Sequence, residues 1–235
     1  MSAERSWVAL PDGKLSLVLH TPEVGGRVPC VIACHGLSAS KDSDKYLLLA
    51  DALPSAGLAL ARFDFRGCGE SSGREEDTTI ATRIEDIEAV VAHLEGHPRL
   101  DGRLGLLGSS LGGFVALFIA VKHPGAPVVT WNAPASLTEL ANDDLRDNRG
   151  LGVAFALEYM RGHYALTPKG VARHLIVHGA ADDVVALDHG MQLLDQAGEP
   201  CDLLVIPDGD HRLTDPGHRA QAVTASRDWL RRFLP

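Results

Sequence analysis

Residues Gly108-Ser109-Ser110-Leu111-Gly112 spell the pattern G-x-S-x-G and stand between two apolar runs of different character. The run before them, residues 103–107, has the length of a short buried strand. Residues 111–121 (LGGFVALFIAV) are apolar on nearly every face, as in a central helix packed against a sheet. The pattern predicts a strand, a sharp turn and a helix, with the Ser110 hydroxyl exposed on the turn. Ser109 does not fit the motif, because a frame centred on it would need glycines where two leucines stand.

Strand-like and helix-like patterns alternate along the rest of the chain. The clearest helix is residues 80–94, where apolar residues recur at spacings of four, three, four and three. The alternation implies right-handed crossovers and a mostly parallel sheet flanked by helices, an α/β fold. Residues 11–13 (PDG) form a turn signature that predicts an antiparallel hairpin at the sheet edge. We expect eight strands, at residues 7–10, 15–20, 28–34, 58–63, 103–107, 128–131, 174–178 and 202–206, and further helices at residues 46–56, 187–197 and 218–233.

The segment between the sixth and seventh expected strands, residues 132–173, is unusually long. It holds about forty residues where a connection in an α/β unit usually takes about 2–6 plus a helix. A charged stretch, residues 142–147, is followed by an apolar run, residues 151–159. This insertion fits a lid or small cap over a site, and it fits equally an extra helix packed on the sheet. We see no repeat or linker and predict a single domain over residues 1–235.

Composition excludes several classes of protein. A chain of 235 residues lies within the range of single large α/β domains. A net charge of −9 argues against nucleic acid or an anionic membrane surface as the main partner. The first residues lack the apolar core of a secretory signal, and no stretch is long enough to cross a bilayer. We therefore expect a cytoplasmic protein, and the oligomeric state stays open.

The cysteines are scattered along the chain, at Cys30, Cys34, Cys68 and Cys201. Three of them lie inside or beside strand-like runs, which suits small buried thiols better than a disulfide framework. Cys30 and Cys34 precede His35 and could suggest part of a metal site, but this spacing along one strand more often marks core positions. Because no HExxH or CxxC pair accompanies them, we predict no metal and no other cofactor.

Taken with the G-x-S-x-G turn, four further motifs make the chain resemble the α/β-hydrolase superfamily over essentially its whole length. Residues 31–37 (VIACHGL) resemble the strand and His-Gly turn that supplies one oxyanion-hole amide in that family. Residues 64–71 (DFRGCGES) resemble its D-x-R-G-x-G-x-S loop. Residues 177–185 (VHGAADDVV) and 209–211 (GDH) resemble its acid and histidine loops. The short chain, residues 73–78 (GREEDT) and the insertion look most like small bacterial carboxylesterases of the feruloyl/cinnamoyl esterase type.

The resemblance implies a catalytic triad of Ser110, Asp182 and His211, in the family's chain order. A serine hydroxyl is a poor nucleophile until a base takes its proton, and a carboxylate fixes the tautomer of that base. One expected helix and one strand separate Asp182 from His211, enough to return both loops to the same end of a parallel sheet. Asp183 is the alternative acid and His218 the alternative base.

Other positions have supporting roles in this prediction. The backbone N–H groups of Leu37 and Leu111 are candidates for the oxyanion hole, since a developing oxyanion needs donors already in place. Asp64 and Arg66 are expected to organise the neighbouring loop. Possible walls of the substrate pocket are the aromatic side chains near the insertion, Trp131, Phe155, Tyr159 and Tyr164.

These residues together predict a serine carboxylesterase that acts on a small-molecule ester without a cofactor. The same triad would also serve a thioesterase or an acyl-aminoacyl peptidase. A further alternative is a non-catalytic ligand-binding protein that keeps the hydrolase fold.

Overall fold

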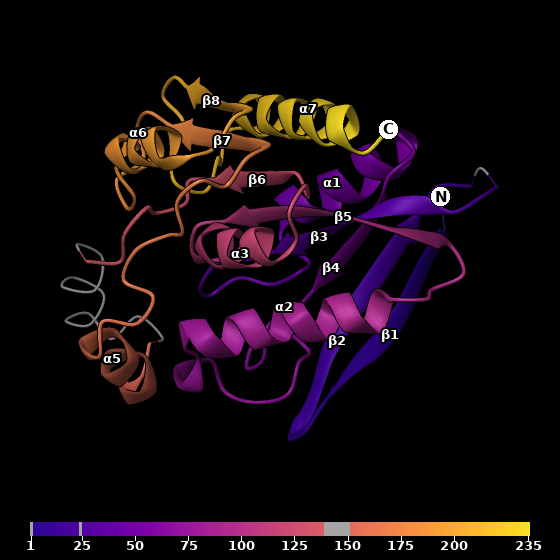
Figure 1. Cartoon of the computed structure of the whole chain (residues 1–235), viewed down its shortest axis with the longest axis horizontal. Coiled ribbons are helices and arrows are strands. Elements are labelled where there is room, and N and C mark those ends of the chain that lie inside the picture. The colour runs from indigo at the N-terminus through magenta and orange to yellow at the C-terminus, as the bar shows by residue number, and fades with distance from the viewer. Residues whose placement is uncertain (1, 24, 139–150) are drawn as a thin grey trace.

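An eight-stranded sheet runs through the computed structural model, which describes residues 2–23, 25–138 and 151–235 (Figure 1). The strand order is β1-β2-β4-β3-β5-β6-β7-β8. The strands are β1 (Ser2–Leu10), β2 (Gly13–Thr21), β3 (Val28–Cys34), β4 (Ala59–Phe63), β5 (Leu100–Ser109), β6 (Val128–Trp131), β7 (His174–Gly179) and β8 (Cys201–Ile206). The helices are α1 (Asp44–Ser55), α2 (Ile80–Leu94), α3 (Leu111–Lys122), α5 (Val153–Met160), α6 (Leu187–Gln196) and α7 (Pro216–Phe233), with one 3₁₀ turn, η1 (Glu75–Asp77).

Strand direction confirms the predicted mostly parallel α/β fold. β1 pairs antiparallel with β2, and β2 with β4, whereas every later pair of neighbours is parallel. The N-terminal hairpin is therefore where the turn signature predicts it. β1 is longer than residues 7–10, because its ladder with β2 continues back to Ser2. Most of that extension is exposed and polar, so it lacks the apolar alternation from which a strand is predicted.

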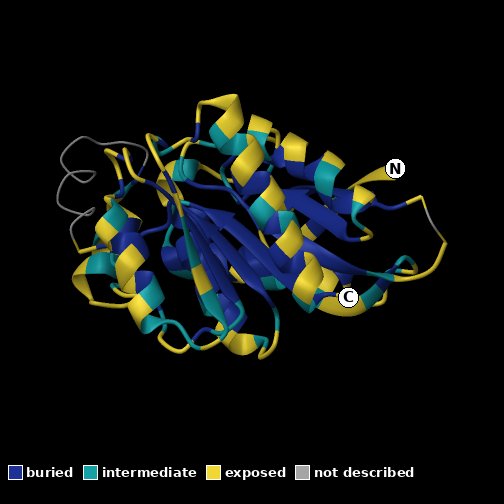
Figure 2. Cartoon of the chain, turned by 90° about the horizontal axis from the view of Figure 1, so that it is seen from above, coloured by how far each residue is buried: buried dark blue, intermediate teal, exposed yellow. Residues whose placement is uncertain are grey.

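Helices cover both faces of the sheet. On one face α2, α3 and α6 pack through side chains such as Ile84, Phe114 and Leu193. On the other face α1 and α7 pack through side chains such as Leu49 and Leu230. Seen from above, the sheet is a buried layer and the helices turn their exposed faces outward (Figure 2). The continuous apolar character of the central strands follows from this burial on both faces.

The last helix begins two residues earlier than the sequence pattern suggests. α7 starts at Pro216 and not at His218, because the Asp215 side chain accepts hydrogen bonds from the Gly217 and His218 amides. An aspartate at the N-cap followed by proline at the first helical position is a strong helix start. The prediction rests on apolar periodicity, which does not detect a capping residue at the start of a helix.

The described residues of the insertion pack against the rest of the fold. Its two ends pair with each other, since the Leu137 amide donates to the Ala165 carbonyl and the Thr167 amide to the Ala135 carbonyl. The Glu158 carboxylate of α5 accepts hydrogen bonds from the Ile80 and Ala81 amides, at 2.6 and 3.0 Å, and so caps the N-terminus of α2. The charged residues 142–147 lie outside the described residues. The reading of residues 132–173 as a lid stays a prediction.

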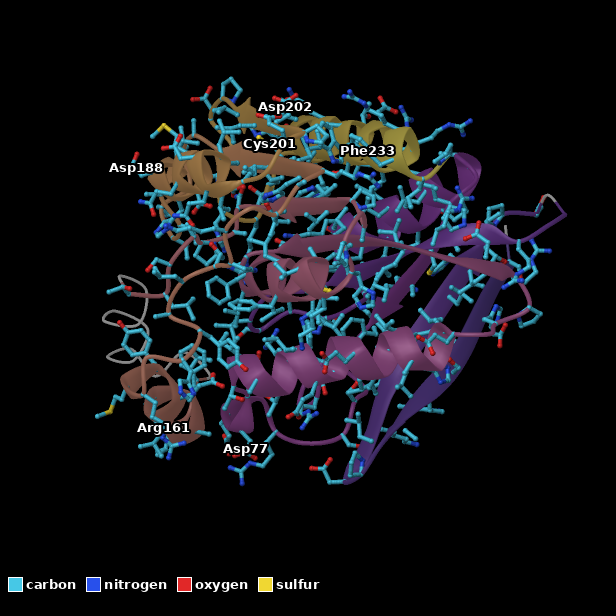
Figure 3. The ribbon with its side chains drawn as sticks, viewed as in Figure 1. Asp77, Arg161, Asp188, Cys201, Asp202 and Phe233 are labelled. Atoms are coloured by element: carbon cyan, nitrogen blue, oxygen red, sulfur yellow. The ribbon has the colours of Figure 1, made fainter. Side chains whose placement is uncertain are left out.

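All four cysteines are free thiols, as predicted. Cys30, Cys34 and Cys68 are buried, and burial raises the pKa of the Cys30 and Cys68 thiols to about 12. Cys201 lies at the start of β8, an edge strand of the sheet, next to Asp202 (Figure 3). Across the described ranges, no three His, Cys, Asp or Glu side chains gather as metal ligands would, and no helix is long and apolar enough to span a membrane.

Candidate active site

Ser110 occupies the sharp turn between β5 and α3. Its backbone has φ 54° and ψ −128°. A positive φ is energetically unfavourable for any residue that carries a side chain. The turn is tight because a Cβ atom at Gly108 would lie 2.4 Å from the Gly112 carbonyl oxygen. A Cβ atom at Gly112 would lie 2.1 Å from the Cys34 carbonyl oxygen. The two motif glycines are thus required by close approach of backbone to backbone, and the strand-turn-helix expectation is met.

Three side chains from distant parts of the chain form a hydrogen-bonded row at the ends of β5, β7 and β8. The Ser110 Oγ lies 3.1 Å from His211 Nε2, and His211 Nδ1 lies 2.8 Å from Asp182 Oδ2. Because a carboxylate only accepts, Nδ1 carries the proton and Nε2 is free to accept from the serine hydroxyl. The Asp182 side chain is fully buried, while the His211 side chain keeps 17% of its surface exposed. The row therefore runs from the interior toward solvent.

Asp182 is held by the backbone of its own loop. Its Oδ1 accepts hydrogen bonds from the Val184 and Val185 amides, at 2.9 and 2.8 Å, which leaves Oδ2 for His211. The alternative acid, Asp183, is exposed and has no hydrogen bond to His211 within the described chain. The alternative base, His218, lies in the first turn of α7, and its amide is bound by Asp215. The geometry thus brings together the three residues that the resemblance implies and not the alternatives.

His178 lies beside the carboxylate without competing for it. Its Nε2 donates to the Val185 carbonyl at 2.8 Å and is 3.8 Å from Asp182 Oδ2. Burial lowers the pKa of His178, so its ring stays neutral near pH 7. The ring therefore supports the acid loop, and His211 is the imidazole that makes the short contact with Asp182.

Two backbone amides are available near Ser110. Leu37 follows β3, and within the described residues its amide has no hydrogen-bond partner. Leu111 is the first residue of α3, where helix geometry leaves the amide without an intrahelical acceptor. A Cβ atom at Gly36 would lie 3.2 Å from Ser110 Cβ, so the β3 loop passes directly beside the serine. The predicted oxyanion-hole amides thus come from two segments in close contact.

A buried network fixes the loop that carries Leu37. His35 Nδ1 donates to the Gly36 carbonyl at 2.8 Å, and its Nε2 accepts the Phe65 amide at 3.1 Å. Burial, and then the nearby Arg83 guanidinium, lower the pKa of His35 to about 3, so the ring is neutral. Arg83 Nη1 in turn donates to the His35 carbonyl at 3.2 Å. These bonds hold the backbone before Leu37 in one conformation.

Asp64 and Arg66 organise their loop, as the sequence predicts. Asp64 is fully buried and accepts from the Lys41 ammonium at 2.7 Å and from the Glu70 amide at 3.0 Å. Arg66 Nε donates to Asp86 Oδ1 at 2.7 Å, which ties the loop to α2. Neither residue lines the pocket beside Ser110.

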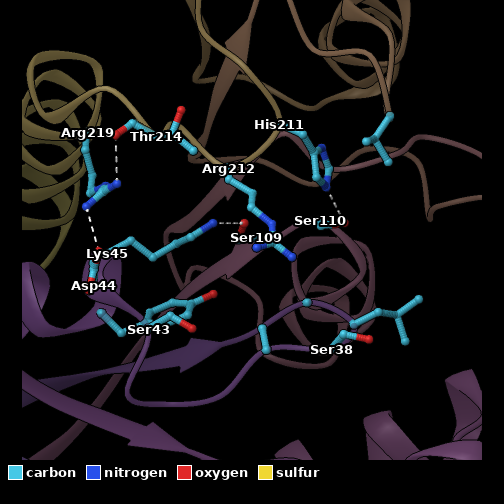
Figure 4. A pocket seen from close by; sticks show the side chains of 15 residues that line it. Ser38, Ser43, Asp44, Lys45, Ser109, Ser110, His211, Arg212, Thr214 and Arg219 are labelled. Carbon is cyan, nitrogen blue, oxygen red and sulfur yellow. Dashed lines mark hydrogen bonds and ion pairs between the residues drawn. The ribbon is translucent and has the colours of Figure 1, made fainter. Parts of the chain in front are cut away.

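A pocket of about 690 Å³ opens beside Ser110 and His211 (Figure 4). This volume lies within the range of sites for small molecules. Its walls come from the loop after β3, the start of α1, the end of β5, the acid loop, the histidine loop and α7. The lining residues are Gly36, Leu37, Ser38, Ala39, Ser43, Asp44, Lys45, Tyr46, Ser109, Ser110, Val184, His211, Arg212, Thr214 and Arg219.

The aromatic residues predicted as pocket walls pack elsewhere among the described residues, and a role for them in substrate binding stays a prediction. None of the four belongs to the lining of the pocket. Trp131 is 1% exposed and donates to Ser226 Oγ of α7 at 2.9 Å, because β6 is buried on both faces. Phe155 is buried in the core cluster on the other face. Tyr159 packs against that cluster, and the Tyr164 ring lies 5.3 Å from the Phe118 ring.

Asn132 was not predicted as a site residue, because the sequence places it at the start of the insertion. The residue is 1% exposed and has φ 49° at the end of β6. Its Nδ2 donates to the Asp210 and His211 carbonyls, both at 3.0 Å, and its Oδ1 accepts the Gly179 amide at 3.0 Å. One side chain thus joins the ends of three strands and holds the histidine loop. An asparagine directly after a buried strand on the same sheet edge is the signal that could have found it.

The positively charged residues of the pocket, Lys45, Arg212 and Arg219, were not predicted from the sequence either. Lys45 and Arg219 come from α1 and α7, where nothing in the sequence pattern links them to the triad. Arg212 directly follows His211, and this adjacency is the one signal that could have drawn attention to it.

Sequence comparison gives relatives across most of the chain. A family model described as serine aminopeptidase, S33, matches residues 27–134. An uncharacterized protein of Mycobacterium tuberculosis is 30% identical over 222 residues, covering 89% of this chain and 71% of that protein. Human mitochondrial palmitoyl-protein thioesterase ABHD10 is 23% identical over 216 residues, covering 81% and 69%.

Structural comparison gives the same architecture. A putative hydrolase from Agrobacterium vitis has a TM-score of 0.80 and 22% identity, covering 97% of this chain and 98% of its own. Est1E from Butyrivibrio proteoclasticus, with ferulic acid bound, has a TM-score of 0.77 and 20% identity, covering 96% and 97%. Mouse alpha/beta hydrolase domain-containing protein 10 has a TM-score of 0.80 and 19% identity, covering 96% and 97%. These structures show the fold, and with the sequence relatives they establish that this chain belongs to the α/β-hydrolase superfamily.

Proposed function

We propose that this chain hydrolyses carboxylic esters through an acyl intermediate on Ser110. The observation that carries the proposal is the unbroken row of hydrogen bonds from Asp182 through His211 to Ser110, which ends in the pocket. Such a row turns a weakly nucleophilic hydroxyl into an attacking group, because the imidazole takes its proton and the carboxylate stabilises the resulting imidazolium.

Acylation follows from this arrangement. Ser110 Oγ forms a bond to the ester carbonyl carbon while its proton passes to His211 Nε2, and the carbonyl electrons move onto oxygen. The Leu37 and Leu111 amides donate to that oxyanion, where each such donor is worth about 10²–10³ in rate. The carbon–oxygen bond to the alcohol then breaks, and the departing oxygen takes the proton from His211. The products of this half-reaction are the free alcohol and acyl-Ser110.

Deacylation repeats the chemistry with water. A water molecule gives a proton to His211 Nε2 as its oxygen attacks the acyl carbonyl, and the same amides hold the second oxyanion. Collapse of this intermediate breaks the bond to Ser110 Oγ, which takes the proton back from His211. The carboxylic acid leaves, and the row of hydrogen bonds is restored. No cofactor takes part in these steps.

Thioesters are the second candidate substrate. The human relative is named a palmitoyl-protein thioesterase, and a thioester carbonyl can be attacked by the same serine. Est1E, which shares the fold, binds ferulic acid. The chemistry at Ser110 is common to both substrate types, so they differ only in the leaving group that His211 protonates. Paired esters and thioesters with one acyl group separate the two by their kcat/KM.

Labelling with a fluorophosphonate probe tests the proposal, because the probe needs an activated serine and no particular acyl group. We expect label on Ser110 in the native chain, none in Ser110→Ala, and a rate reduced by orders of magnitude in His211→Ala. Ser109→Ala should keep the label, which distinguishes the two adjacent serines. His218→Ala is the matched control for His211→Ala and should also keep it.

The outcomes separate the rival hypotheses. Label on Ser110 that depends on His211, followed by turnover of 4-nitrophenyl acetate, supports the esterase. Label that persists in His211→Ala but is lost in His218→Ala would refute the assigned base. A folded native chain that takes no label would favour a ligand-binding protein that keeps the hydrolase fold.

A further inference from the structure

Three cationic side chains line the pocket beside Ser110, namely Lys45, Arg212 and Arg219. Asp44 is the one acidic residue among the lining residues. The chain as a whole carries a net charge of −9, so a locally positive pocket opposes the overall charge of the molecule. A cavity with one sign of charge concentrates ligands of the opposite sign.

Arg219 already has partners within the protein. Its Nη1 lies 3.2 Å from the Asp44 carboxylate, its Nε donates to the Leu213 carbonyl, and its Nη2 donates to the Thr214 carbonyl. These contacts join α7 to α1 and hold the backbone after His211. The Arg219 guanidinium is thus already engaged by groups of the protein.

Lys45 lacks such compensation. Its Nζ donates to Ser109 Oγ at 2.8 Å, and no carboxylate of the described residues lies within 4.0 Å of it. Burial, and then the charges of Arg219 and Arg212, lower the pKa of Lys45 to about 8, against the weaker opposing effect of Asp210 and Asp182. A partly buried ammonium close to two guanidinium groups is costly unless an anion joins it.

Arg212 is the second uncompensated charge. It is exposed, and within the described chain its guanidinium has neither a hydrogen bond nor an ion pair. In Figure 4 its side chain points into the pocket, toward Ser109 and Ser110. Arg212 and Lys45 line the same pocket, so the two charges face one space. A guanidinium with its donors free and a nearby ammonium form a site for a carboxylate or phosphate.

We propose that Arg212 and Lys45 bind an anionic group of the substrate, a carboxylate or a phosphate, while Ser110 attacks its ester carbonyl. The inference rests on the proposed function and defines its substrate class as esters that carry a negative charge near the scissile bond. The two anions differ in shape and charge but present the same oxygen acceptors to the two cations.

Matched ester pairs test this substrate class. The acyl-side pair is 4-nitrophenyl hydrogen glutarate and its neutral methyl ester. On the alcohol side, 4-acetoxybenzoate and 4-acetoxyphenyl phosphate are each compared with methyl 4-acetoxybenzoate. We expect at least one anionic ester to exceed its neutral partner by roughly 10- to 100-fold in kcat/KM, as charged hydrogen bonds imply. The anionic ester with the largest ratio of kcat/KM to its neutral partner identifies the anion and the side of the ester that carries it.

Variants assign the preference to the two residues. Arg212→Gln should lower the ratio of anionic to neutral kcat/KM at least tenfold, and Lys45→Met should lower it in the same direction. Arg161→Gln, which removes an equal charge at the exposed end of α5 (Figure 3), should leave the ratio unchanged. An equal fall in Arg161→Gln would show that overall charge sets the preference, and a ratio near one in the native chain would overturn the proposal.

A binding measurement keeps this inference separate from the proposed function. In Ser110→Ala, calorimetry compares the anionic member of each pair with its neutral partner, and the same comparison is made after adding Arg212→Gln. We expect tighter binding of one anion that is lost with Arg212. If no anion is preferred, the proposed anion site is refuted, but the proposed esterase function is not affected. If one is preferred but the native chain turns over no ester, the anion site stands and the esterase fails.

Discussion

Asp182→Asn is expected to remove most of the activity while leaving the shape of the site almost unchanged. In the native site Oδ1 accepts two backbone amides and Oδ2 accepts from His211 Nδ1. The asparagine must keep its carbonyl oxygen toward the Val184 and Val185 amides, since the reverse orientation leaves both donors without an acceptor, and the buried Val185 amide alone costs about 1–3 kcal/mol. Its NH₂ group therefore faces His211.

That orientation forces His211 into the wrong tautomer. To accept from the new NH₂ group, Nδ1 must give up its proton, so Nε2 carries the proton and cannot take one from Ser110. The expected loss is about 10⁴ in kcat, equivalent to about 5.4 kcal/mol in the activation free energy. Steady-state hydrolysis of 4-nitrophenyl acetate measures the loss, and thermal unfolding checks that the fold is retained.

Asp183→Asn is the matched control, because it makes the same chemical change one residue away on an exposed side chain. It should keep kcat within a factor of about two, since a surface substitution away from a structural feature changes little. A loss smaller than tenfold in Asp182→Asn would refute the tautomer argument. Equal losses in both variants would show that the negative charge of the loop matters and not its hydrogen bond to His211.

Three further outcomes are expected. Asn132→Ala should lower kcat more than it changes KM in ester hydrolysis and should lower the melting temperature, because the histidine loop loses two hydrogen bonds and the Gly179 amide loses its acceptor. Gly112→Ala should cost about 1–3 kcal/mol in denaturant unfolding, because its Cβ would lie 2.1 Å from the Cys34 carbonyl oxygen, whereas Gly25→Ala, with open space around it, should be nearly neutral. Burial lowers the pKa of His174 to about 3, below its unfolded value of 6.5, so the unfolded chain binds the extra proton and stability falls as pH drops from about 6.5 toward 3. His174→Gln should reduce the slope of unfolding free energy against pH by about 1.4 kcal/mol per unit between pH 4 and 6, and an unchanged slope would contradict the buried neutral ring.

The fold and the triad geometry could be predicted because both depend on features that lie close together in the sequence. The turn at Ser110 is fixed by glycines two residues away, and the acid and histidine loops directly follow apolar strands. Parallel strands bring their carboxyl ends to one edge, so residues far apart in the chain meet there. Asn132 obeys the same rule, but a single asparagine gives no motif to mark it.

The pocket walls could not be predicted in this way. Trp131 directly precedes Asn132 at the end of β6, but its side chain bonds to Ser226 of α7, because side chains alternate between the two faces of a sheet along a strand. Lys45 and Arg219 reach the pocket only because α1 and α7 pack together on one face of the sheet. Which residues of two packed helices turn toward a cavity depends on how the helices cross, and helical periodicity marks only their apolar faces.

If both proposals hold, different side chains of one pocket carry out the reaction and select the substrate. Ser110, Asp182 and His211 follow strands, and their loops are held by backbone contacts such as those of Asp182. The uncompensated charges of Lys45 and Arg212 come from α1 and from the side chain next to the base. Asp182→Asn should therefore lower kcat equally for anionic and neutral esters, whereas Arg212→Gln should change their ratio. If Asp182→Asn altered the ratio as strongly as Arg212→Gln, the two functions would share one set of residues, and the assignment of selectivity to Arg212 and Lys45 would be wrong.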